Sequence, residues 1–327
     1  MRFSEIGKSG INASIIGLGT WVMGGWLWGG ADEVKAQKAV EASIDSGITL
    51  IDTAPAYGMG KSEEIVGRAI KGKRDKLVIA TKCGLIWHEA KGTHFLTYGD
   101  GTKIYRYLGA ESIEHEVNES LKRLGTDYID LLQPHWQDST TPIEETMTAM
   151  MKLKEKGKIR AIGVSNATLE QLKEYSKYGE LDSDQEKYSM IDRQVEELVL
   201  PWCRENKVSM LAYSSMSRGL LTGKMSPDRK FDGDDSRKED PRFSPENIKK
   251  ANALIEKYLK PVAQEKNITI GQLTVAWLIS KENVFALCGA RDPKQALENV
   301  KAGDVILDEE DNKAIGKFID EYEKNCI

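Results

Sequence analysis

Eight short apolar segments alternate with helical segments along this 327-residue chain, and this alternation is the strongest constraint on its fold. The segments expected to form strands are 13–18, 48–52, 77–82, 128–134, 159–164, 181–185, 208–213 and 284–288. Strands that alternate with helices pair in parallel through right-handed crossovers. Eight such units predict an α/β fold, a closed (β/α)8 TIM barrel rather than an open doubly wound sheet.

The segments around the expected barrel predict its additions. A turn composition at Lys8-Ser9-Gly10 predicts a small N-terminal β-hairpin within residues 1–15, and further helices follow at the C-terminus. Helices are expected at 32–46, 61–71, 110–124, 142–156, 167–178, 195–206, 245–266, 269–281, 293–302 and 308–324. A long polar loop is expected at 83–109. No linker composition divides the chain, so residues 1–327 are expected to form one domain.

Composition excludes several classes of protein. The formal net charge of −5 gives no electrostatic footprint for nucleic acid or an anionic membrane surface. No apolar stretch has the length of a membrane span, and the first ten residues lack the apolar core of a signal peptide. The four cysteines show no metal-ligand spacing, which favours reduced thiols in a cytoplasmic protein and predicts no metal site.

Polar residues gather where the expected strands end. They are Asp52, Lys82, His135, Ser165, Asn166, Gln185, Tyr213, Ser214, Gly289 and Arg291. In a (β/α)8 barrel the carboxyl ends of the strands form the catalytic face. Polar side chains at that end of so many strands are hard to explain by packing, so they predict an active site.

Three of these residues, Asp52, Lys82 and His135, together with the loop residue Tyr57 suggest acid–base chemistry. A lysine close to Tyr57 is expected to lower the pKa of its phenol, so that Tyr57 can exchange a proton with a carbonyl oxygen. Lys82 has to stay charged in a partly buried site, and Asp52 offsets the cost of burying that charge. His135 is expected to orient the carbonyl oxygen by hydrogen bonding. The reaction also needs a hydride, which implies a nicotinamide cofactor.

Simpler interpretations remain open for each residue taken alone. Asp52 and Lys82 at adjacent strand ends are often a structural ion pair, and Tyr57 could be a packed loop aromatic. Two rival motifs fail: in GMGKS at 58–62 the first glycine of a P-loop pattern falls on Pro55, and Gly17-x-Gly19 lacks the third glycine of a dinucleotide fingerprint.

Tryptophans mark the loops that border the expected catalytic face. They are Trp21, Trp26, Trp28, Trp87 and Trp136. They could pack these loops together, or they could form an aromatic-walled pocket for a cyclic or sugar-like substrate or a broadly apolar one. The loop 88–106 is long enough to suggest a cap over the site.

The same motifs carry a resemblance. GLGTW at 17–21, the segment 52–67, DYIDLLQPHW at 127–136, GVSN at 163–166, AYSSMSRGLLTGK at 212–224 and GARDPKQALEN at 289–299 occur in this order. Over almost its whole length the chain resembles the aldo-keto reductase superfamily, most closely its bacterial general-stress and inositol-utilisation type.

The resemblance implies an NADP(H)-dependent oxidoreductase acting on a small-molecule carbonyl or alcohol. It implies the catalytic residues Asp52, Tyr57, Lys82 and His135, and the substrate contacts Trp21, Trp28, Trp87 and Trp136. The cofactor contacts that it implies are Gly19, Thr20, Trp21, Asp52, Ser165, Asn166, Gln185, Tyr213, Ser214, Ser215, Met216, Ser217, Arg218, Gly219, Leu220, Gly289, Ala290, Arg291, Gln295 and Asn299. Among these, Arg218 is expected beside the pyrophosphate.

One departure leaves the choice of cofactor open. Many relatives carry a basic residue directly after the Gly-Ala-Arg triplet, where this chain has Asp292, and an acid there would repel a 2′-phosphate. NAD(H) therefore stays an alternative to NADP(H). One other function also stays open, a catalytically weak cofactor-sensing module that regulates a partner. A barrel isomerase or lyase would need a metal or phosphate site, which the His/Asp/Glu spacing does not offer. The presence of all four expected catalytic residues favours the reductase, and no obligate protein partner is evident.

Overall fold

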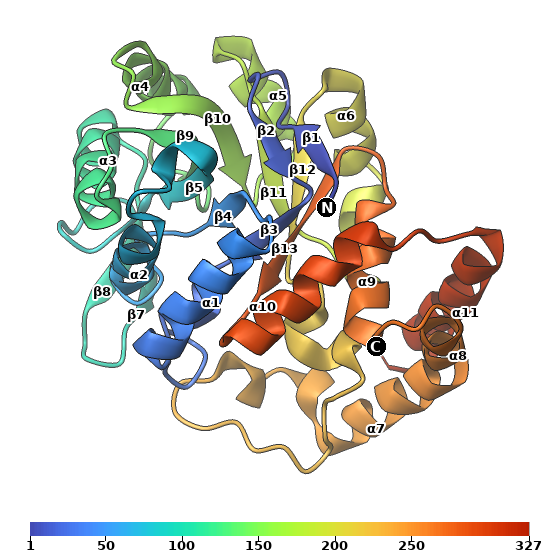
Figure 1. Ribbon diagram of the computed structural model, residues 1–327. Helices are drawn as coiled ribbons and strands as arrows, with labels where there is room; N and C mark the ends of the chain where they lie inside the picture. Colours follow the sequence, from blue (N-terminus) through green and yellow to red (C-terminus); the bar gives the residue numbers. More distant parts are fainter. Residues whose placement is uncertain (327) are drawn as a thin grey trace.

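The computed structural model describes residues 1–326 and contains a closed barrel of eight parallel strands (Figure 1). In chain order the strands are β3 (Ile16–Gly19), β4 (Leu50–Asp52), β5 (Val78–Cys83), β9 (Ile129–Pro134), β10 (Ile159–Ser165), β11 (Ser183–Lys187), β12 (Ser209–Tyr213) and β13 (Val284–Gly289). Each pairs in parallel with the next, and β13 closes the barrel on β3. The predicted fold class is confirmed.

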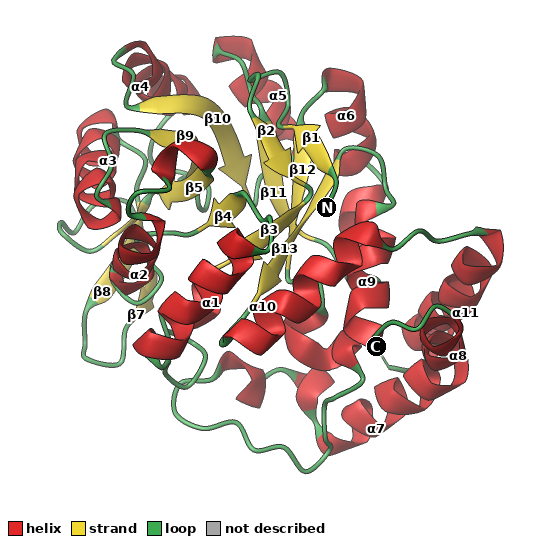
Figure 2. Ribbon diagram, viewed as in Figure 1, coloured by secondary structure: helices red, strands yellow, loops and turns green. Residues whose placement is uncertain are grey.

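Helices surround the barrel on its outer side (Figure 2). They are α1 (Glu33–Asp45), α2 (Lys61–Ile70), α3 (Ala110–Leu124), α4 (Ile143–Glu155), α5 (Leu169–Tyr178), α6 (Val199–Asn206), α7 (Pro245–Leu254), α8 (Lys260–Glu265), α9 (Ile270–Ile279), α10 (Pro293–Val300) and α11 (Glu309–Asn325). Because helices cover the outside and side chains fill the inside, β5 and β9 are buried at every residue.

An N-terminal hairpin, β1 (Phe3–Glu5) with β2 (Asn12–Ser14), covers the amino end of the barrel. The predicted strand 13–18 is therefore divided between two strands: Ser14 ends β2, where it pairs with Phe3, and it also hydrogen-bonds to Thr49. The Ser14 amide donates to Thr49 Oγ1 at 2.9 Å, and the Thr49 amide donates to Ser14 Oγ at 3.0 Å. The barrel strand starts only at Ile16.

The expected loop 83–109 is in large part an antiparallel sheet, which corrects the prediction. β6 (Leu85–Ile86), β8 (Lys103–Arg106) and β7 (Thr93–Thr97) pair in that order. The segment is polar because most of β7 and its turn is exposed, while Ile104 is fully buried. Ile104 packs with Trp26, Ala56 and Leu85 in a small apolar cluster of its own, which fixes the sheet over the barrel mouth.

Three smaller differences concern single turns. Trp21–Met23 form a 3-10 turn in a segment that was predicted to be a loop. The predicted helix 195–206 is a 3-10 turn, Gln194–Glu196, followed by α6. The predicted helix 245–266 is α7 and α8 joined by a π-helical turn, Ile255–Leu259. Within residues 1–326 no helix is long and apolar enough to cross a membrane.

Candidate active site

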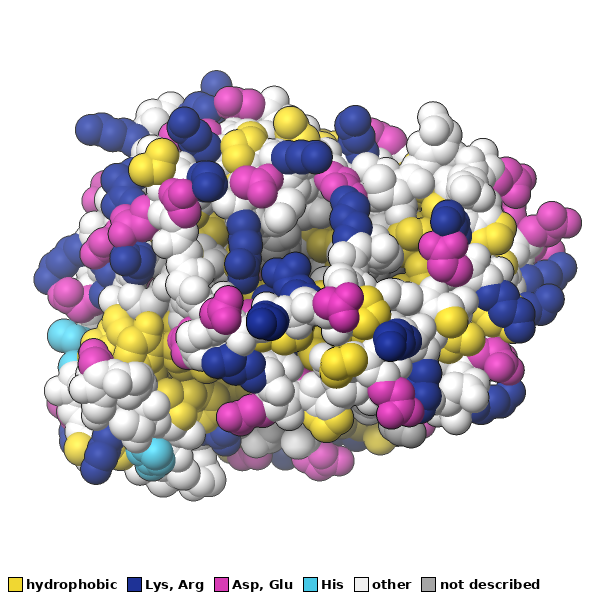
Figure 3. Space-filling view, turned by 90° about the horizontal axis from the view of Figure 1, so that it is seen from below, with side chains coloured by type: hydrophobic (Ala, Val, Ile, Leu, Met, Phe, Trp, Pro, Cys, Tyr) yellow, Lys and Arg dark blue, Asp and Glu magenta, His cyan; other side chains and the backbone are white. Residues whose placement is uncertain are grey.

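A cavity of about 590 Å³ opens at the carboxyl ends of the barrel strands. Its two halves differ in chemistry. One half is cationic and is lined by Arg218, Lys224, Arg229, Arg237 and Arg291; the other is aromatic and apolar, lined by Trp21, Trp26, Leu85, Phe95, Leu96 and Trp136. Figure 3 views this side of the molecule and shows dark-blue side chains around a central hollow, with an apolar area to its left.

Most predicted site residues meet in this cavity. Those that line it are Gly19, Trp21, Trp28, Asp52, Tyr57, His135, Trp136, Ser165, Asn166, Gln185, Tyr213, Ser214, Ser215, Met216, Arg218, Gly219, Gly289, Arg291, Gln295 and Asn299. Thr20, Lys82, Ser217, Leu220 and Ala290 are fully or almost fully buried and lie behind the lining. Trp87 does not line the cavity, since Leu85, Phe95 and Leu96 form the wall beside it, so the expected substrate contact of Trp87 is not supported.

Lys82 and Asp52 form a buried ion pair at the cavity floor. The Lys82 ammonium lies 2.9 Å from Asp52 Oδ1 and 2.8 Å from Oδ2, and it also donates to the Thr53 carbonyl at 2.9 Å. The Lys82 side chain is fully buried. Burial lowers the pKa of Lys82, and the Asp52 charge acts in the opposite direction. The Asp52 carboxylate therefore stabilises the Lys82 cation at a place that solvent does not reach.

Tyr57 lies beside this pair and beside His135. The Lys82 nitrogen is 5.1 Å from the centre of the Tyr57 ring, and the His135 ring packs edge-on at 5.6 Å. Burial, and then the Asp52 charge, raise the pKa of the Tyr57 phenol well above its ordinary value. The expectation that Lys82 lowers the pKa is wrong for this arrangement, because the ammonium is bound to Asp52 rather than to the phenol.

His135 is held as a neutral imidazole. Burial, and then the charge of Lys82, hold the pKa of His135 well below its ordinary value. Its Nδ1 atom is buried without a hydrogen-bond partner among residues 1–326. A neutral imidazole carries one N–H donor, so the ring can donate to an oxygen bound in the cavity.

Hydrogen bonds link four polar residues at the ends of β10, β11 and β12 on one side of the cavity: Ser165, Asn166, Gln185 and Tyr213. Asn166 has a left-handed backbone with φ of 55°, and its amide donates to the His135 carbonyl at 2.9 Å and to Ser165 Oγ at 3.0 Å. Tyr213 donates its hydroxyl to Asn166 Oδ1 at 2.8 Å. Gln185 differs from its expected role, because its amide nitrogen donates to Asp52 Oδ1 at 2.8 Å. Its side chain therefore supports the ion pair while it lines the cavity.

The chain after β12 has an unusual backbone. Ser214, Ser217 and Arg218 all have φ between 45° and 54°, and Gly219 has φ of 96°. Non-glycine residues rarely adopt this region, and left-handed residues in a turn bring backbone N–H groups together into an anion-binding nest. The segment Ser217–Thr222 ends against α9, where Thr274 donates to the Leu221 carbonyl at 3.0 Å. A phosphate cradle fits this position.

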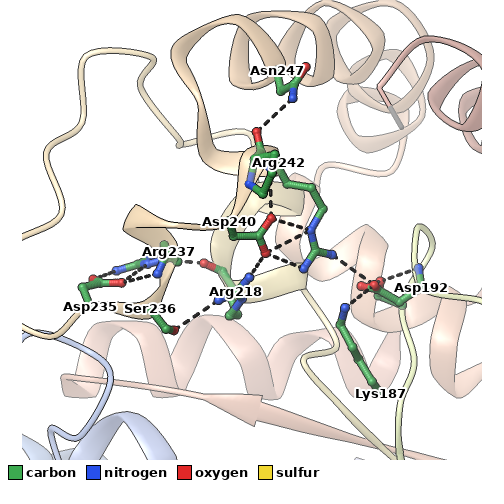
Figure 4. Close-up of polar contacts among 11 residues, drawn as sticks. Lys187, Asp192, Arg218, Asp235, Ser236, Arg237, Asp240, Arg242 and Asn247 are labelled. Atoms are coloured by element: carbon green, nitrogen blue, oxygen red, sulfur yellow. Dashed lines mark hydrogen bonds and ion pairs between the residues drawn. The ribbon is translucent and has the colours of Figure 1, made fainter.

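The guanidinium of Arg218 is held by a carboxylate rather than free in the cavity. Figure 4 shows Asp240 between Arg218 and Arg242, with Arg242 reaching on to Asp192. Arg242 lies 2.7 Å from Asp240 and 3.0 Å from Asp192. Arg218 also donates to Ser236 at 3.2 Å. The predicted pyrophosphate contact therefore requires Arg218 to share its charge with Asp240.

The long segment after β12 is tied across the cavity to the tryptophan loop. The Asp234 carboxylate accepts the amides of Leu27 at 2.8 Å and Gly29 at 2.9 Å, and the Ser236 amide donates to the Leu27 carbonyl at 3.1 Å. Arg237 stacks on Trp28 at 4.7 Å. Only the fold brings positions 27 and 234 together, so no role for Leu27, Asp234 or Ser236 followed from the sequence.

The last expected cofactor contacts, Gly289, Arg291, Gln295 and Asn299, lie between the end of β13 and the end of α10. Asp292 is its N-cap: the Asp292 carboxylate accepts the Gln295 amide at 2.9 Å. Gln295 in turn accepts the Arg291 amide at 2.9 Å, and Asn299 donates to the Gly289 carbonyl at 3.0 Å. One oxygen of Asp292 is thus turned into the helix, where a negative charge is favourable. This capping role is a structural reason for an acid at position 292.

Comparison with known proteins identifies the family. The profile of the Aldo/keto reductase family matches residues 15–320. The chain belongs to this family. Membership makes this aldo-keto reductase an oxidoreductase, as the sequence analysis predicted from the same segments that line the cavity.

Close relatives differ in the activities that their names state. The chain is 42% identical to the aldo-keto reductase YhdN of Bacillus subtilis, over 98% of this chain and 94% of that protein. It is 39% identical to an NADH-specific methylglyoxal reductase of Escherichia coli, over 99% and 100%. Among solved structures, a glycerol dehydrogenase of Gluconobacter oxydans is 37% identical, with a TM-score of 0.88 over 100% of this aldo-keto reductase and 97% of that chain.

A more distant solved structure carries a cofactor. An aldo/keto reductase from Klebsiella pneumoniae in complex with NADP and acetate is 27% identical, with a TM-score of 0.75 over 98% of this chain and 96% of that chain. In the present aldo-keto reductase the indole nitrogens of Trp21 and Trp28 are buried and have no hydrogen-bond partner in the part of the chain that the structure describes. The cavity thus combines indole N–H donors, the backbone nest after β12 and several guanidinium groups. Such a combination fits a phosphorylated dinucleotide.

Proposed function

We propose that this enzyme reduces the carbonyl group of an aldehyde or ketone, or oxidises the corresponding alcohol, with NADP(H) in the cationic half of the cavity. One arrangement carries the proposal: in a single cavity, Tyr57 lies beside the buried Lys82 ammonium and packs against a neutral His135. The family match supports the same reaction class.

The protein supplies a proton and orients the carbonyl oxygen of the substrate. A phenol with a raised pKa is protonated at neutral pH, which is the form that donates to a carbonyl oxygen. The nicotinamide, when bound, supplies the hydride that no side chain carries. As the carbonyl carbon gains that hydride, its oxygen takes the Tyr57 proton. Lys82 partly neutralises the Asp52 charge, which would otherwise oppose the phenolate more strongly. His135 holds the oxygen through its N–H donor.

The cationic half supports binding of the cofactor. In this proposal the nest at Ser214, Arg218 and Gly219 receives the pyrophosphate, Asn166 and Tyr213 hold the nicotinamide, and Arg291 approaches an adenosine 2′-phosphate. NADP(H) is proposed as the preferred form because Arg291 and Arg237 both face this end of the cavity. The NADH-specific relative shows that the related chains differ in this choice.

A cofactor titration followed by a substrate panel tests the proposal. NADPH and NADH are added to the purified enzyme, and aldehydes, ketones, sugars and cyclitols are then screened by nicotinamide absorbance. We expect tighter binding of NADPH and turnover of aromatic or apolar aldehydes, because the second half of the cavity is aromatic. Tight binding without turnover across the panel would favour the cofactor-sensing module. Binding of neither cofactor would contradict the proposal.

A further inference from the structure

Two carboxyl groups share the outer face of β11, on the side away from the barrel interior. Asp184 is completely buried, and neither of its carboxylate oxygens has a hydrogen-bond partner among residues 1–326. Glu186 follows two residues later and is partly buried. Since alternate residues of a strand share one face, both side chains point away from that of Gln185, which binds Asp52 on the inner side.

This acid pair costs stability where it lies. Burial, and then the charge of Glu186, raise the pKa of Asp184 well above its ordinary value, and burial raises the pKa of Glu186 to about 7. The neighbouring titratable groups whose pKa these charges raise are Cys203 of α6 and Tyr213 of β12, and neither is a cation. Residues that break a packing rule in this way are found mainly at functional sites.

Glu186 is bound to the turn that carries Asn166. Its Oε1 atom accepts the Ala167 amide at 2.8 Å. The two preceding residues are fixed to the same strand, because the Asn166 amide donates to the Gln185 carbonyl at 3.1 Å and Ser165 Oγ donates to it at 2.9 Å. Of these three bonds, the one from Ala167 is the one that depends on a side chain of β11.

The turn fixes the part of the cavity where the nicotinamide is proposed to bind. Asn166 has φ of 55°, in the left-handed region that is uncommon for a non-glycine residue. Its side chain holds both the His135 carbonyl and the Tyr213 hydroxyl. Since His135 and Tyr213 both line the cavity, a shift of this turn would disturb two sides of the site at once.

We propose that Glu186 is a positioning residue for the nicotinamide, acting through the Ala167 amide and the turn that carries Asn166. The inference rests on the proposed function. Loss of the carboxyl leaves the Ala167 amide without its acceptor, and the turn is then free to shift away from the cofactor. The effect is confined to the nicotinamide end, because Arg291 and Gln295 at the other end are bonded to each other.

A pair of ligands isolates the nicotinamide end. Adenosine 2′,5′-bisphosphate keeps the adenosine and the 2′-phosphate of NADPH but lacks the nicotinamide. Glu186→Leu is expected to weaken NADPH binding roughly tenfold, which corresponds to about 1.4 kcal/mol, and to leave binding of the bisphosphate unchanged. Calorimetric titrations measure both constants. Glu186→Gln should restore most of the NADPH affinity, because its amide oxygen can accept from Ala167.

Glu180→Leu is the matched control, because Glu180 is an exposed carboxylate just before β11 and its ion-pair partner, Lys154, lies 3.8 Å away. It should change neither constant. A merely structural role of Glu186 predicts a lower melting temperature and an equal loss for both ligands in Glu186→Leu, and that result would overturn the inference. Unchanged NADPH binding in Glu186→Leu, or no recovery in Glu186→Gln, would overturn it too.

The same titrations separate this inference from the proposed function, because binding does not require turnover. If the wild-type enzyme binds NADPH and reduces aldehydes while Glu186→Leu shows no selective loss, only the role of Glu186 is refuted. If Glu186→Leu shows the selective loss but the wild-type enzyme turns over no substrate, only the proposed reaction is refuted. Binding of neither ligand to the wild-type enzyme would refute both.

Discussion

The Lys82 ammonium lies within 2.9 Å of both carboxylate oxygens of Asp52, and both side chains are almost completely buried. Such a pair stabilises a fold only while both partners are present, because removing one leaves an unpaired charge in a low-dielectric site. Gln185 is the one other side chain that donates to this carboxylate in the described chain. The pair is thus a structural requirement as well as a proposed part of the chemistry.

Lys82→Met is expected to destabilise the protein by about 3–5 kcal/mol, because Asp52 would stay buried without a cation. Urea unfolding followed by circular dichroism measures this loss. The double variant Lys82→Met with Asp52→Asn should lose less than the single variant, since no buried charge remains. A double variant at least as unstable as Lys82→Met would contradict the electrostatic explanation.

Tyr57→Phe is expected to lower kcat by roughly 10²–10⁴-fold, because the proposed proton donor is removed while the ring stays in place. The dissociation constant for NADPH should change little, since the phenol hydroxyl makes no hydrogen bond to the cofactor end in the described chain. Stopped-flow reduction of an aldehyde from the panel measures the first effect and a fluorescence titration the second. Turnover close to that of the wild type would rule out Tyr57 as the acid.

Glu116→Gln is expected to stabilise the protein at alkaline pH. Burial raises the pKa of Glu116 to about 8, although the hydrogen bond from the Gly84 amide acts to lower it. For a carboxyl with a raised folded-state pKa, the free energy of unfolding falls as the pH rises from the unfolded value of about 4.5 to about 8. Glutamine can still accept from Gly84 but has no charge.

The stability gain from Glu116→Gln should therefore be absent below about pH 4.5 and exceed about 1 kcal/mol near pH 8. Unfolding curves measured at pH 5, 6.5 and 8 test this. A difference between variant and wild type that does not depend on pH would show that packing, rather than ionisation, is responsible.

Asp292→Asn is expected to tighten NADPH binding by roughly two- to fivefold and to leave NADH binding unchanged. Asparagine keeps the N-cap of α10 but removes the negative charge beside Arg291, and an exposed charge pair has an effect of this size. Titrations at low and high salt measure both constants, and the effect should shrink at high salt. An equal change for both cofactors would indicate a loss of helix geometry instead.

Local patterns in the chain predicted much of this protein. Apolar runs and helix caps specify the eight β/α units, since each depends on periodicity within some twenty residues. The same patterns predicted that Asp52, Lys82 and His135 lie near one another, because parallel strands of a barrel present their carboxyl ends on one face.

Only the tertiary structure decided the contacts that join distant segments. It placed Trp26 in the cavity wall and Trp87 outside it, bound Arg218 to Asp240, and stacked Arg106 on Phe95. Such contacts depend on how loops without periodicity pack against each other, which no local pattern specifies. It also reversed the expected direction of the Tyr57 pKa, because the burial of the phenol and its distance from the Asp52 carboxylate are properties of the assembled site.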